Sequence, residues 1–371
     1  MQITYLFSFL PVFLTLALIQ APALAANGAG SEDYPSATAA QETARARDSR
    51  PQAGGTSNAV GRPMSESGLA ELQSAAMARF QARDYDAAVA LARRYLLAGG
   101  TDPEVRRLPG RAYFLGGDIP NAARELQLEI QAAEKAGRAP SEDSLRLLGT
   151  CYLRLKDSNA YSWSLEQLVT YHPRREYWAE LLERTQSRPD FGKRLALDVQ
   201  RLRFLTDTLG SAADYVRTVN LALQAGFPLE ARSILDKGFA SGVMGAGKEA
   251  EQHRQLQALV RTRADEERAR LARPDSATKA ASAKDGLDLV HLGFSYVTNG
   301  EFPKGIALME QGLRKGGFGS IPQDTRLRVG IGYLLAGQKG RAISTFKNVG
   351  GMHGAADLAR LWGIYAQGLP G

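Results

Sequence analysis

Three stretches of this chain share one five-residue pattern: LGTCY at residues 148–152, LGFSY at residues 292–296 and VGIGY at residues 329–333. A weaker copy, PGRAY, occupies residues 109–113. Residues three and four apart lie on one face of a helix, so the apolar residue, the glycine and the tyrosine of each copy line a single stripe. The pattern therefore predicts a helix that presents a small residue beside an aromatic one to a neighbouring helix.

A turn and then a second small residue follow the aromatic position. Gly117 and Ala122 follow the weaker copy, and Gly337 and Ala342 follow the last one. Glycine tolerates the left-handed backbone on which many helices end. A small residue beyond the turn lets a second helix approach the first closely. Each copy therefore predicts two antiparallel helices joined by a short turn.

The copies recur at a nearly constant spacing. Tyr113 and Tyr152 lie 39 residues apart, and Tyr296 and Tyr333 lie 37 apart. Degenerate copies begin near Leu72 and span residues 215–238. The pattern resembles the tetratricopeptide repeat, whose period is about 34 residues. The resemblance implies an all-α fold, an α-solenoid of antiparallel tetratricopeptide-like helix pairs. It assigns these residues to repeat packing: Gly110, Tyr113, Ala122, Leu148, Gly149, Tyr152, Leu292, Gly293, Tyr296, Gly330, Tyr333 and Ala342.

Outside the copies, composition divides the chain into segments. Residues 68–243 are predicted to form an N-terminal array, and residues 244–284 a long charged helix (248–272) with a loop or linker (274–284). Residues 285–371 are predicted to hold the C-terminal repeats, closed by a helix over 355–366 that resembles a solenoid cap. Residues 174–209 lack the small-residue pattern, and the solenoid could divide into two lobes at this stretch together with the charged helix after Gly247.

The first 25 residues read as an export signal. Residues 3–19 are almost entirely apolar, and Ala23 and Ala25 fit the small-residue rule for a cleavage site. We therefore expect a cleaved signal peptide over 1–25, a periplasmic product if the host has two membranes, and no membrane span afterwards. No Lys or Arg precedes the apolar run, so an uncleaved inner-membrane signal anchor stays open. Residues 26–67, rich in small and polar residues, are predicted to be a disordered linker.

Charge and cysteine content narrow the class of partner. Lys and Arg number 46 against 39 Asp and Glu, a net charge of +7. The basic residues alternate with acidic ones along the predicted helices, which argues against a nucleic-acid-binding stripe.

The single cysteine, Cys151, has no partner for an internal disulfide and lies in an apolar helical stretch. The fold must therefore rest on its hydrophobic core.

The motifs that would indicate catalysis are incomplete. Residues 242–249, GVMGAGKE, match a phosphate-binding loop until Glu249 takes the place of the Ser or Thr that would hold magnesium. Of the four histidines, only His253 has a nearby ligand, Glu249, on the same helix face, and two ligands do not make a zinc site. No nucleophile–base–acid order is present. We therefore expect no enzyme activity, no metal and no cofactor.

The surface residues then become the candidates for a site. In tetratricopeptide arrays the first helix of each pair lines a groove, and the resemblance places four arginines there in the N-terminal half: Arg107, Arg111, Arg146 and Arg154. They would form a basic groove for an acidic peptide or an anionic glycan; alternatively, they only solvate the helices. In the C-terminal half the same positions are apolar and predict either core or an apolar groove: Phe294, Val297, Ile331, Leu334 and Leu335.

Two functions from different classes fit this reading. The first is an exported scaffold for protein–protein interaction in the assembly of a cell-envelope, polysaccharide or secretion complex. The second is a glycan- or peptidoglycan-binding solenoid, or the accessory domain of a cell-wall enzyme. A glycan binder should expose Trp163, Trp178 or Tyr161 in a cleft, whereas a peptide scaffold should present a ladder of arginines and polar side chains.

Overall fold

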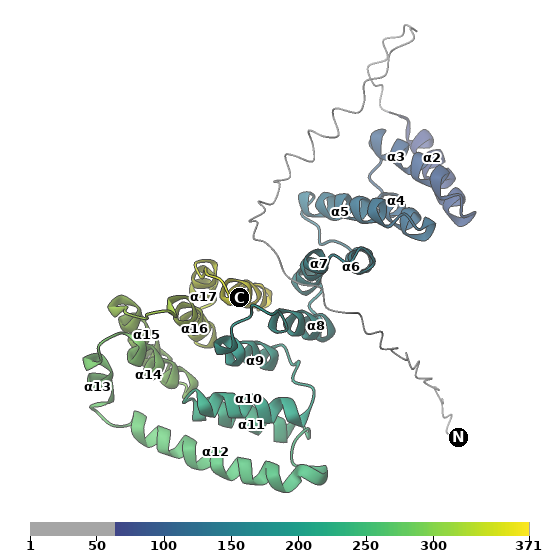
Figure 1. The fold of residues 1–371 in the computed structure, drawn as a ribbon. Coiled ribbons are helices and arrows are strands. Elements are labelled where there is room, and N and C mark those ends of the chain that lie inside the picture. Colours follow the sequence, from purple (N-terminus) through teal and green to yellow (C-terminus); the bar gives the residue numbers. More distant parts are fainter. Residues whose placement is uncertain (1–63, 371) are drawn as a thin grey trace, which may run out of the picture. The chain divides into compact units, whose positions relative to one another are not determined.

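The computed structural model describes residues 64–370, and all regular structure in that range is helical (Figure 1). The predicted signal peptide and all but the last residues of the predicted linker lie outside it. The prediction of an all-α solenoid of antiparallel tetratricopeptide-like helix pairs is confirmed. The α-helices are α2 (Glu66–Gln81), α3 (Tyr85–Leu97), α4 (Pro103–Gly116), α5 (Ile119–Lys135), α6 (Glu142–Arg154), α7 (Ser158–Tyr171), α8 (Arg175–Gln186), α9 (Ala196–Leu205), α10 (Ala212–Gln224), α11 (Pro228–Ala240), α12 (Ala250–Leu271), α13 (Ser276–Ser282), α14 (Leu287–Thr298), α15 (Phe302–Lys315), α16 (Pro322–Leu335), α17 (Lys339–Lys347) and α18 (Ala355–Gly368).

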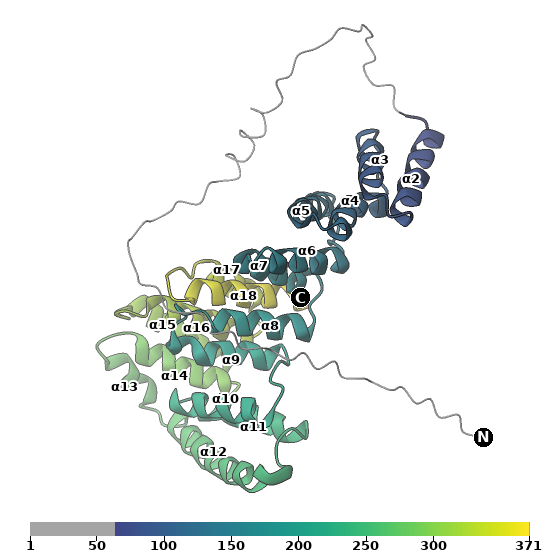
Figure 2. The same cartoon turned by 45° about the vertical axis from the view of Figure 1, so that its right-hand side comes forward.

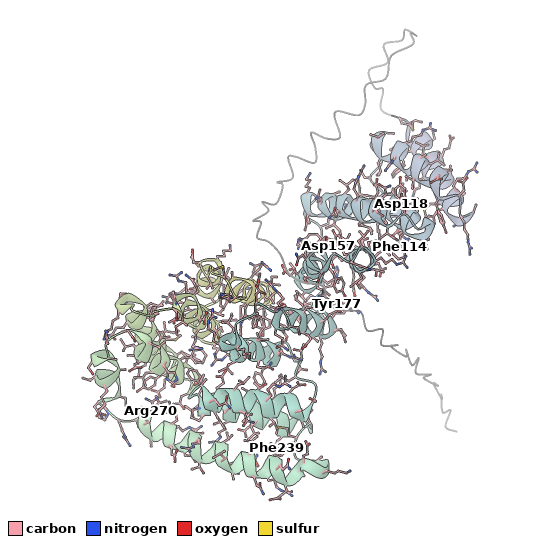
Figure 3. The ribbon with its side chains drawn as sticks, in the orientation of Figure 1. Phe114, Asp118, Asp157, Tyr177, Phe239 and Arg270 are labelled. Carbon is pink, nitrogen blue, oxygen red and sulfur yellow. The ribbon has the colours of Figure 1, made fainter. Side chains whose placement is uncertain are left out.

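The turns between paired helices repeat one backbone conformation. Each places a residue with positive φ where the first helix stops, which ends the helix because the left-handed conformation cannot continue it. In three turns the next residue is an aspartate whose side chain accepts a hydrogen bond from a backbone N–H three residues on; Asp118 and Asp157 are two of them (Figure 3). These caps start the second helix of the pair. The positive-φ residues are Arg83, Gly117, Lys156, Gly226, Gly300 and Gly337.

Small residues set the distance between paired helices. In α14 and α15, a Cβ on Gly293 would lie 2.6 Å from the carbonyl oxygen of Gly305, and a Cβ on Gly305 would lie 2.6 Å from that of Gly293. In α4 a Cβ on Gly110 would lie 2.8 Å from a side-chain carbon of Leu126. The tyrosines of the pattern fill the neighbouring space, and the buried Tyr296 donates a hydrogen bond to the backbone oxygen of Leu271 at 2.7 Å.

Helix α9 lies at the centre of the helices that follow α6. Six consecutive residues from Leu197 to Leu202 are buried, so no face of this helix meets solvent along that stretch. Figures 1 and 2 both show α9 between α8, α10 and α16. A helix surrounded on all sides needs no small-residue stripe, which explains why residues 174–209 lack the repeat pattern. The stretch is the centre of the fold and not a break between two lobes.

The chain then returns on itself through its last described helix. Tyr365 of α18 lies edge-on to Trp178 of α8, with ring centroids 6.3 Å apart, and Arg360 of α18 pairs with Glu166 of α7. The helix predicted as a terminal cap therefore also joins the middle of the array. One hydrophobic cluster runs from α5 to α18. It includes residues on both sides of the two domain boundaries that the sequence predicts, between 243 and 244 and between 284 and 285. Those boundaries remain predictions. A smaller cluster unites α2, α3 and α4.

The segment between the two groups of repeats departs from the prediction in one respect. The long charged helix is present as α12, but residues 274–284 are not a plain loop, because they contain the short helix α13. Its Ala280 is buried in a small cluster with Leu271 and Leu289, which holds the helix in place. No helix within residues 64–370 has the length and apolar character to cross a bilayer.

Candidate functional site

Two of the four predicted arginines are stacked on aromatic rings of the preceding repeat. The guanidinium carbon of Arg111 in α4 lies 5.3 Å from the ring centroid of Phe80 in α2. That of Arg154 in α6 lies 4.4 Å from the ring of Phe114 in α4, which Figure 3 labels. The same cation–π contact thus occurs in two successive repeats. We call the pairs Arg111–Phe80 and Arg154–Phe114 the arginine–phenylalanine stacks.

The stacks hold the arginines without neutralising them. Neither Arg111 nor Arg154 forms an ion pair with any residue in 64–370, and both are exposed. A ring under the flat guanidinium face restricts its motion, while the N–H groups along its edge remain available. Such an edge matches the two oxygens of a carboxylate. The stacks therefore place two guanidinium groups, one repeat apart, where an anion could contact their N–H edges.

The sequence pattern could have identified the phenylalanines. Phe80 stands three residues before the turn residue Arg83, and Phe114 stands three residues before Gly117. That position faces the following repeat, where the arginine projects. Tyr113, which the repeat pattern emphasises, is a different side chain and is partly buried between two core clusters.

The other two predicted arginines have different surroundings. Arg107 is paired with Glu104 of its own helix and donates to the backbone oxygen of Pro103 at 3.3 Å, so its charge is partly compensated. Arg146 lines a hollow of about 440 Å³ between α6, α7 and α8, together with Tyr177 and Glu180. The four side chains thus belong to successive positions along the array and not to one pocket.

A larger polar groove follows the line along which α18 meets α7 and α8. Its volume is about 980 Å³, and Trp163 is 38% exposed in its wall. Arg184 donates to the Ser158 hydroxyl at 2.6 Å and lies 4.7 Å from the centroid of Tyr161. The lining includes these hydroxyl and amide side chains beside charged and apolar ones: Ser158, Asn159, Ser162, Gln167, Thr170, Thr185 and Ser187.

Most charges in this groove are paired across the seam. Arg360 donates to both oxygens of Glu166, at 3.0 and 2.8 Å, and to Asp357 at 3.2 Å. Burial opposes the charge on Arg360, but these hydrogen bonds outweigh that effect and raise the pKa of its guanidinium. Arg188 also pairs with Asp357, at 2.6 Å. These ion pairs therefore join α18 to α7 and to the segment after α8, whereas Arg184 has no ion pair within residues 64–370 and donates to a hydroxyl.

Trp178 and Tyr161 differ from Trp163. Trp178 is 5% exposed and belongs to the core. Tyr161 is half-buried in the wall of the hollow that contains Arg146, where its hydroxyl donates to Glu180 at 2.7 Å. Burial, together with the neighbouring Glu180, raises the pKa of Tyr161 to about 12.

The apolar residues predicted as core or groove in the C-terminal half are largely core. Phe294, Val297, Ile331 and Leu334 are buried, and Leu335 is partly buried. Helix α9 covers the face that they form. Its Arg201 lies 4.5 Å from the ring centroid of Phe294. Helix α9 thus covers part of this face, and Val297, Ile331 and Leu335 also line a cavity beside it.

A buried ion network fixes α9 in that position. Arg201 donates through Nε and Nη2 to the two oxygens of Glu230 in α11, each at 2.6 Å, and through Nη1 to Asp198. Arg328 of α16 lies 3.7 Å from the second oxygen of Asp198. Burial disfavours the charge of Arg201, but the two carboxylates more than offset it and raise the pKa of the guanidinium.

Residues with the potential for chemistry have structural roles. Burial raises the pKa of the Cys151 thiol to about 11, so the thiolate is scarce at neutral pH. His253 accepts a hydrogen bond from the backbone N–H of Gly245 at 3.1 Å and holds the loop of the false phosphate-binding motif. That loop joins α11 to α12, as the sequence predicts. Within residues 64–370, no group of three or more His, Cys, Asp or Glu is placed to hold a metal ion.

The geometry defines a class: a tetratricopeptide-like solenoid whose C-terminal portion folds around its own helix α9. No protein-family model matches the sequence, and no curated protein matches it. Solved structures with similar helix pairs include the TPR2AB domain of yeast Sti1, solved with pHSP90, at 11% identity and a TM-score of 0.28, covering 80% of this chain and 92% of that one. Yeast Tom70 is similar at 9% identity and a TM-score of 0.18, covering 81% and 96%.

Proposed function

We propose that this chain is an exported scaffold that binds protein partners, and that the inner face of α2, α4 and α6 recognises an acidic segment of a partner. The arginine–phenylalanine stacks carry this proposal. Two uncompensated guanidinium groups, each held against a ring, repeat from one helix pair to the next. An extended chain with carboxylates at a matching spacing could engage both at once.

The physical reason for an extended acidic partner is the geometry of the face. Successive repeats present equivalent positions at a regular spacing, so a ligand that runs along the array meets the same chemistry repeatedly. A carboxylate that receives two N–H donors from one guanidinium gains a strong, directional contact. Exposed Leu115 and Leu153, which are 56% and 51% exposed, supply apolar area on α4 and α6.

The test uses a fluorescent peptide rich in glutamate and the same peptide with glutamine in place of glutamate. We expect the glutamate peptide to bind the full chain, and to bind the double variant Arg111→Ala/Arg154→Ala at least about tenfold more weakly, because each charge-assisted contact is worth about 1.5–3 kcal/mol. Fluorescence anisotropy at low and high salt measures the effect.

Two further double variants serve as controls. Arg261→Ala/Arg263→Ala removes the same charge from exposed positions of α12 and should leave binding unchanged. Arg111→Lys/Arg154→Lys keeps the charge but loses the flat fork, so binding should fall partway. Equal binding by all variants, or equal binding of the glutamine peptide, would refute the acidic-segment proposal.

Export and a role in a cell-envelope, polysaccharide or secretion assembly form the finer part of the proposal. The apolar run over 3–19 and the alanines at 23 and 25 support it. N-terminal sequencing of the mature protein distinguishes cleavage near Ala25 from an uncleaved signal anchor. Crosslinking in the native cell, followed by identification of the captured proteins, tests the assembly. Recovery of cytoplasmic partners alone would contradict the envelope role.

Glycan binding is a second candidate, and the exposed Trp163 in the groove along α7, α8 and α18 favours it. An indole face with hydroxyl and amide side chains beside it suits a molecule that has one apolar face and many hydroxyls. The variant Trp163→Ala should then lose binding to an oligosaccharide in a glycan array while it keeps binding to the glutamate peptide. No binding by the wild-type chain would remove this candidate.

A further inference from the structure

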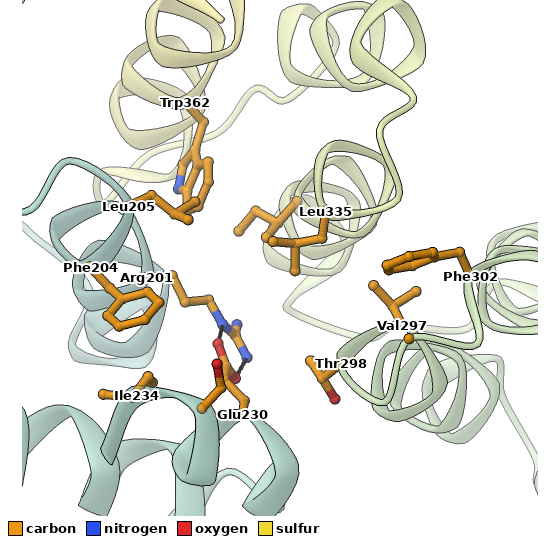
Figure 4. A pocket seen from close by; sticks show the side chains of 13 residues that line it. Arg201, Phe204, Leu205, Glu230, Ile234, Val297, Thr298, Phe302, Leu335 and Trp362 are labelled. Carbon is orange, nitrogen blue, oxygen red and sulfur yellow. Dashed lines mark hydrogen bonds and ion pairs between the residues drawn. The ribbon is translucent and has the colours of Figure 1, made fainter. Parts of the chain in front are cut away.

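The C-terminal portion contains a cavity, partly open to solvent, that the scaffold function does not use. It has a volume of about 260 Å³ and lies where α9, α11, α14, α16 and α18 converge (Figure 4). Its wall is mostly apolar, with Leu205, Val297, Ile331, Leu335 and Trp362 among its lining residues. A concave, mostly apolar site with a few polar groups is the usual form of a small-molecule site.

The polar part of the wall carries no net charge. Arg201 and Glu230 both line the cavity, but they are bonded to each other. With Asp198 and Arg328 they form a set of two cations and two anions, so a charged ligand would find no unpaired opposite charge in the wall. The other polar side-chain groups of the wall are the hydroxyls of Ser233 and Thr298 and the indole N–H of Trp362, which has no hydrogen-bond partner within residues 64–370.

The volume of the cavity and the apolar character of its lining indicate which class of ligand would fit. An apolar cavity of about 150 Å³ stays dry and binds benzene, so one of 260 Å³ suits a somewhat larger apolar body. Water gains little from such a wall, because it needs two to four polar partners. Three lining residues are exposed, Ser233, Gly300 and Phe302, the last at 38%, so the cavity opens to solvent beside them.

We propose that this cavity binds a small uncharged amphipathic molecule: an alkyl chain of about six to ten carbons ending in a neutral hydrogen-bonding group such as a hydroxyl. The chain lies against Leu205, Ile331, Leu335 and Trp362, and the neutral end lies beside Thr298 and Ser233. This site is separate from the arginine–phenylalanine stacks, and either proposal can fail without the other.

The test exploits Trp362 in the wall. Bromine quenches tryptophan fluorescence on contact, so bromo-octanol is added to the full chain and compared with bromo-octanoate, which has the same length but a carboxylate. We expect saturable quenching by bromo-octanol, and apparent binding of bromo-octanoate at least about tenfold weaker because the wall offers its carboxylate no unpaired cation and Glu230 lies nearby.

Two variants with matched controls locate the binding. Leu335→Phe fills part of the cavity and should abolish the saturable phase, whereas Leu128→Phe, at a 51% exposed position of α5, should leave it unchanged. If Leu335→Phe does not fold, Phe302→Glu at the rim should weaken binding by at least about tenfold, with Leu155→Glu as its control. Non-saturating quenching, quenching that survives these substitutions, or equal binding of bromo-octanoate would overturn the proposal.

Discussion

Among the single side chains of this protein, Arg201 is the one whose loss we expect to reduce stability most. Its side chain is 3% exposed and is bonded to two carboxylates on different helices. Its removal would leave Asp198 and Glu230 buried beside each other with one less cation. The change Arg201→Met should therefore lower the free energy of unfolding by about 3–5 kcal/mol, measured by urea denaturation with circular dichroism.

An exposed ion pair provides the control for the Arg201→Met variant. Arg254 and Glu251 lie on α12 with both side chains more than half exposed. Arg254→Met should change the free energy of unfolding by less than about 1 kcal/mol. Similar losses in the two variants would mean that the α9 network is not desolvated as the structure indicates.

Cys151 offers a measurement that depends on pH. Its thiol has an ordinary pKa of 9.0 and a pKa of about 11 in the folded chain, because burial penalises the thiolate. The folded state thus holds the proton more tightly, so this contribution to stability is present below pH 9 and is lost as the pH rises from 9 to about 11. At pH values near 8, alkylation by iodoacetamide should be at least about 100-fold slower in the native chain than in denaturant. Mass spectrometry follows the reaction, and comparable rates would contradict the burial.

Residue-level patterns predicted the repeat core better than the binding surface. The glycine and tyrosine positions follow from helix geometry, since close approach and gap filling constrain them locally. Phe80 and Phe114 were missed because their importance depends on an arginine in the next repeat. Arg201 was missed for the same reason: its partner Glu230 lies on another helix, and only the assembled fold brings the two together.

At the scale of helices, the crossing of α14 and α15 is the most sensitive contact. Gly293 and Gly305 place backbone against backbone, so a methyl group at Gly293 would meet a carbonyl oxygen at 2.6 Å. Gly293→Ala should therefore lower the free energy of unfolding by about 1–3 kcal/mol. Gly340→Ala in α17, where no atom lies within 4 Å of the added carbon, should instead raise it by about 0.5–1 kcal/mol. Calorimetry of both variants decides the matter, and a gain in both would mean that helix propensity and not contact controls the effect.

Helix boundaries were predictable where turns or charge patterns marked them. The turns at Gly117 and Gly337 and the charged helix predicted over 248–272, present as α12, agree with the sequence interpretation. Helix α13 was missed because its Ser, Thr, Lys and Ala residues have no apolar stripe. Contacts of Ala280 with α12 and α14 stabilise it, and such contacts are invisible in a local pattern.

For the whole molecule, the seam between α7 and α18 determines whether the C-terminal portion closes. Arg360 and Glu166 are 194 residues apart and form a two-point ion pair. Arg360→Glu should lower the free energy of unfolding by about 1 kcal/mol, a modest value because Arg360 is about half exposed. Adding Glu166→Arg to this variant should restore at least half of the loss. Failure of the exchange to restore any stability would indicate that the pair does not hold the seam.

The sequence predicted the class of fold but not this closure. Repeat spacing fixes how each helix pair meets the next, because those contacts are local. A terminal helix with one apolar stripe was expected to cover only the end of the array. That α18 also reaches α7 and α8 depends on the summed rotation of the intervening pairs, which short-range patterns do not specify.

The position of α18 at the end of the chain also affects the order in which the helices can fold during synthesis. Helices α2 to α6 touch mainly their neighbours, so they can fold while the rest of the chain is still on the ribosome. Helix α9 has contact partners on α11, α14, α16 and α18. Helix α18 is synthesised more than a hundred residues after α9. Contacts so distant in sequence slow folding. Until α18 emerges, the charged and apolar sides of α9 lack their final cover, and the nascent chain stays open along its centre.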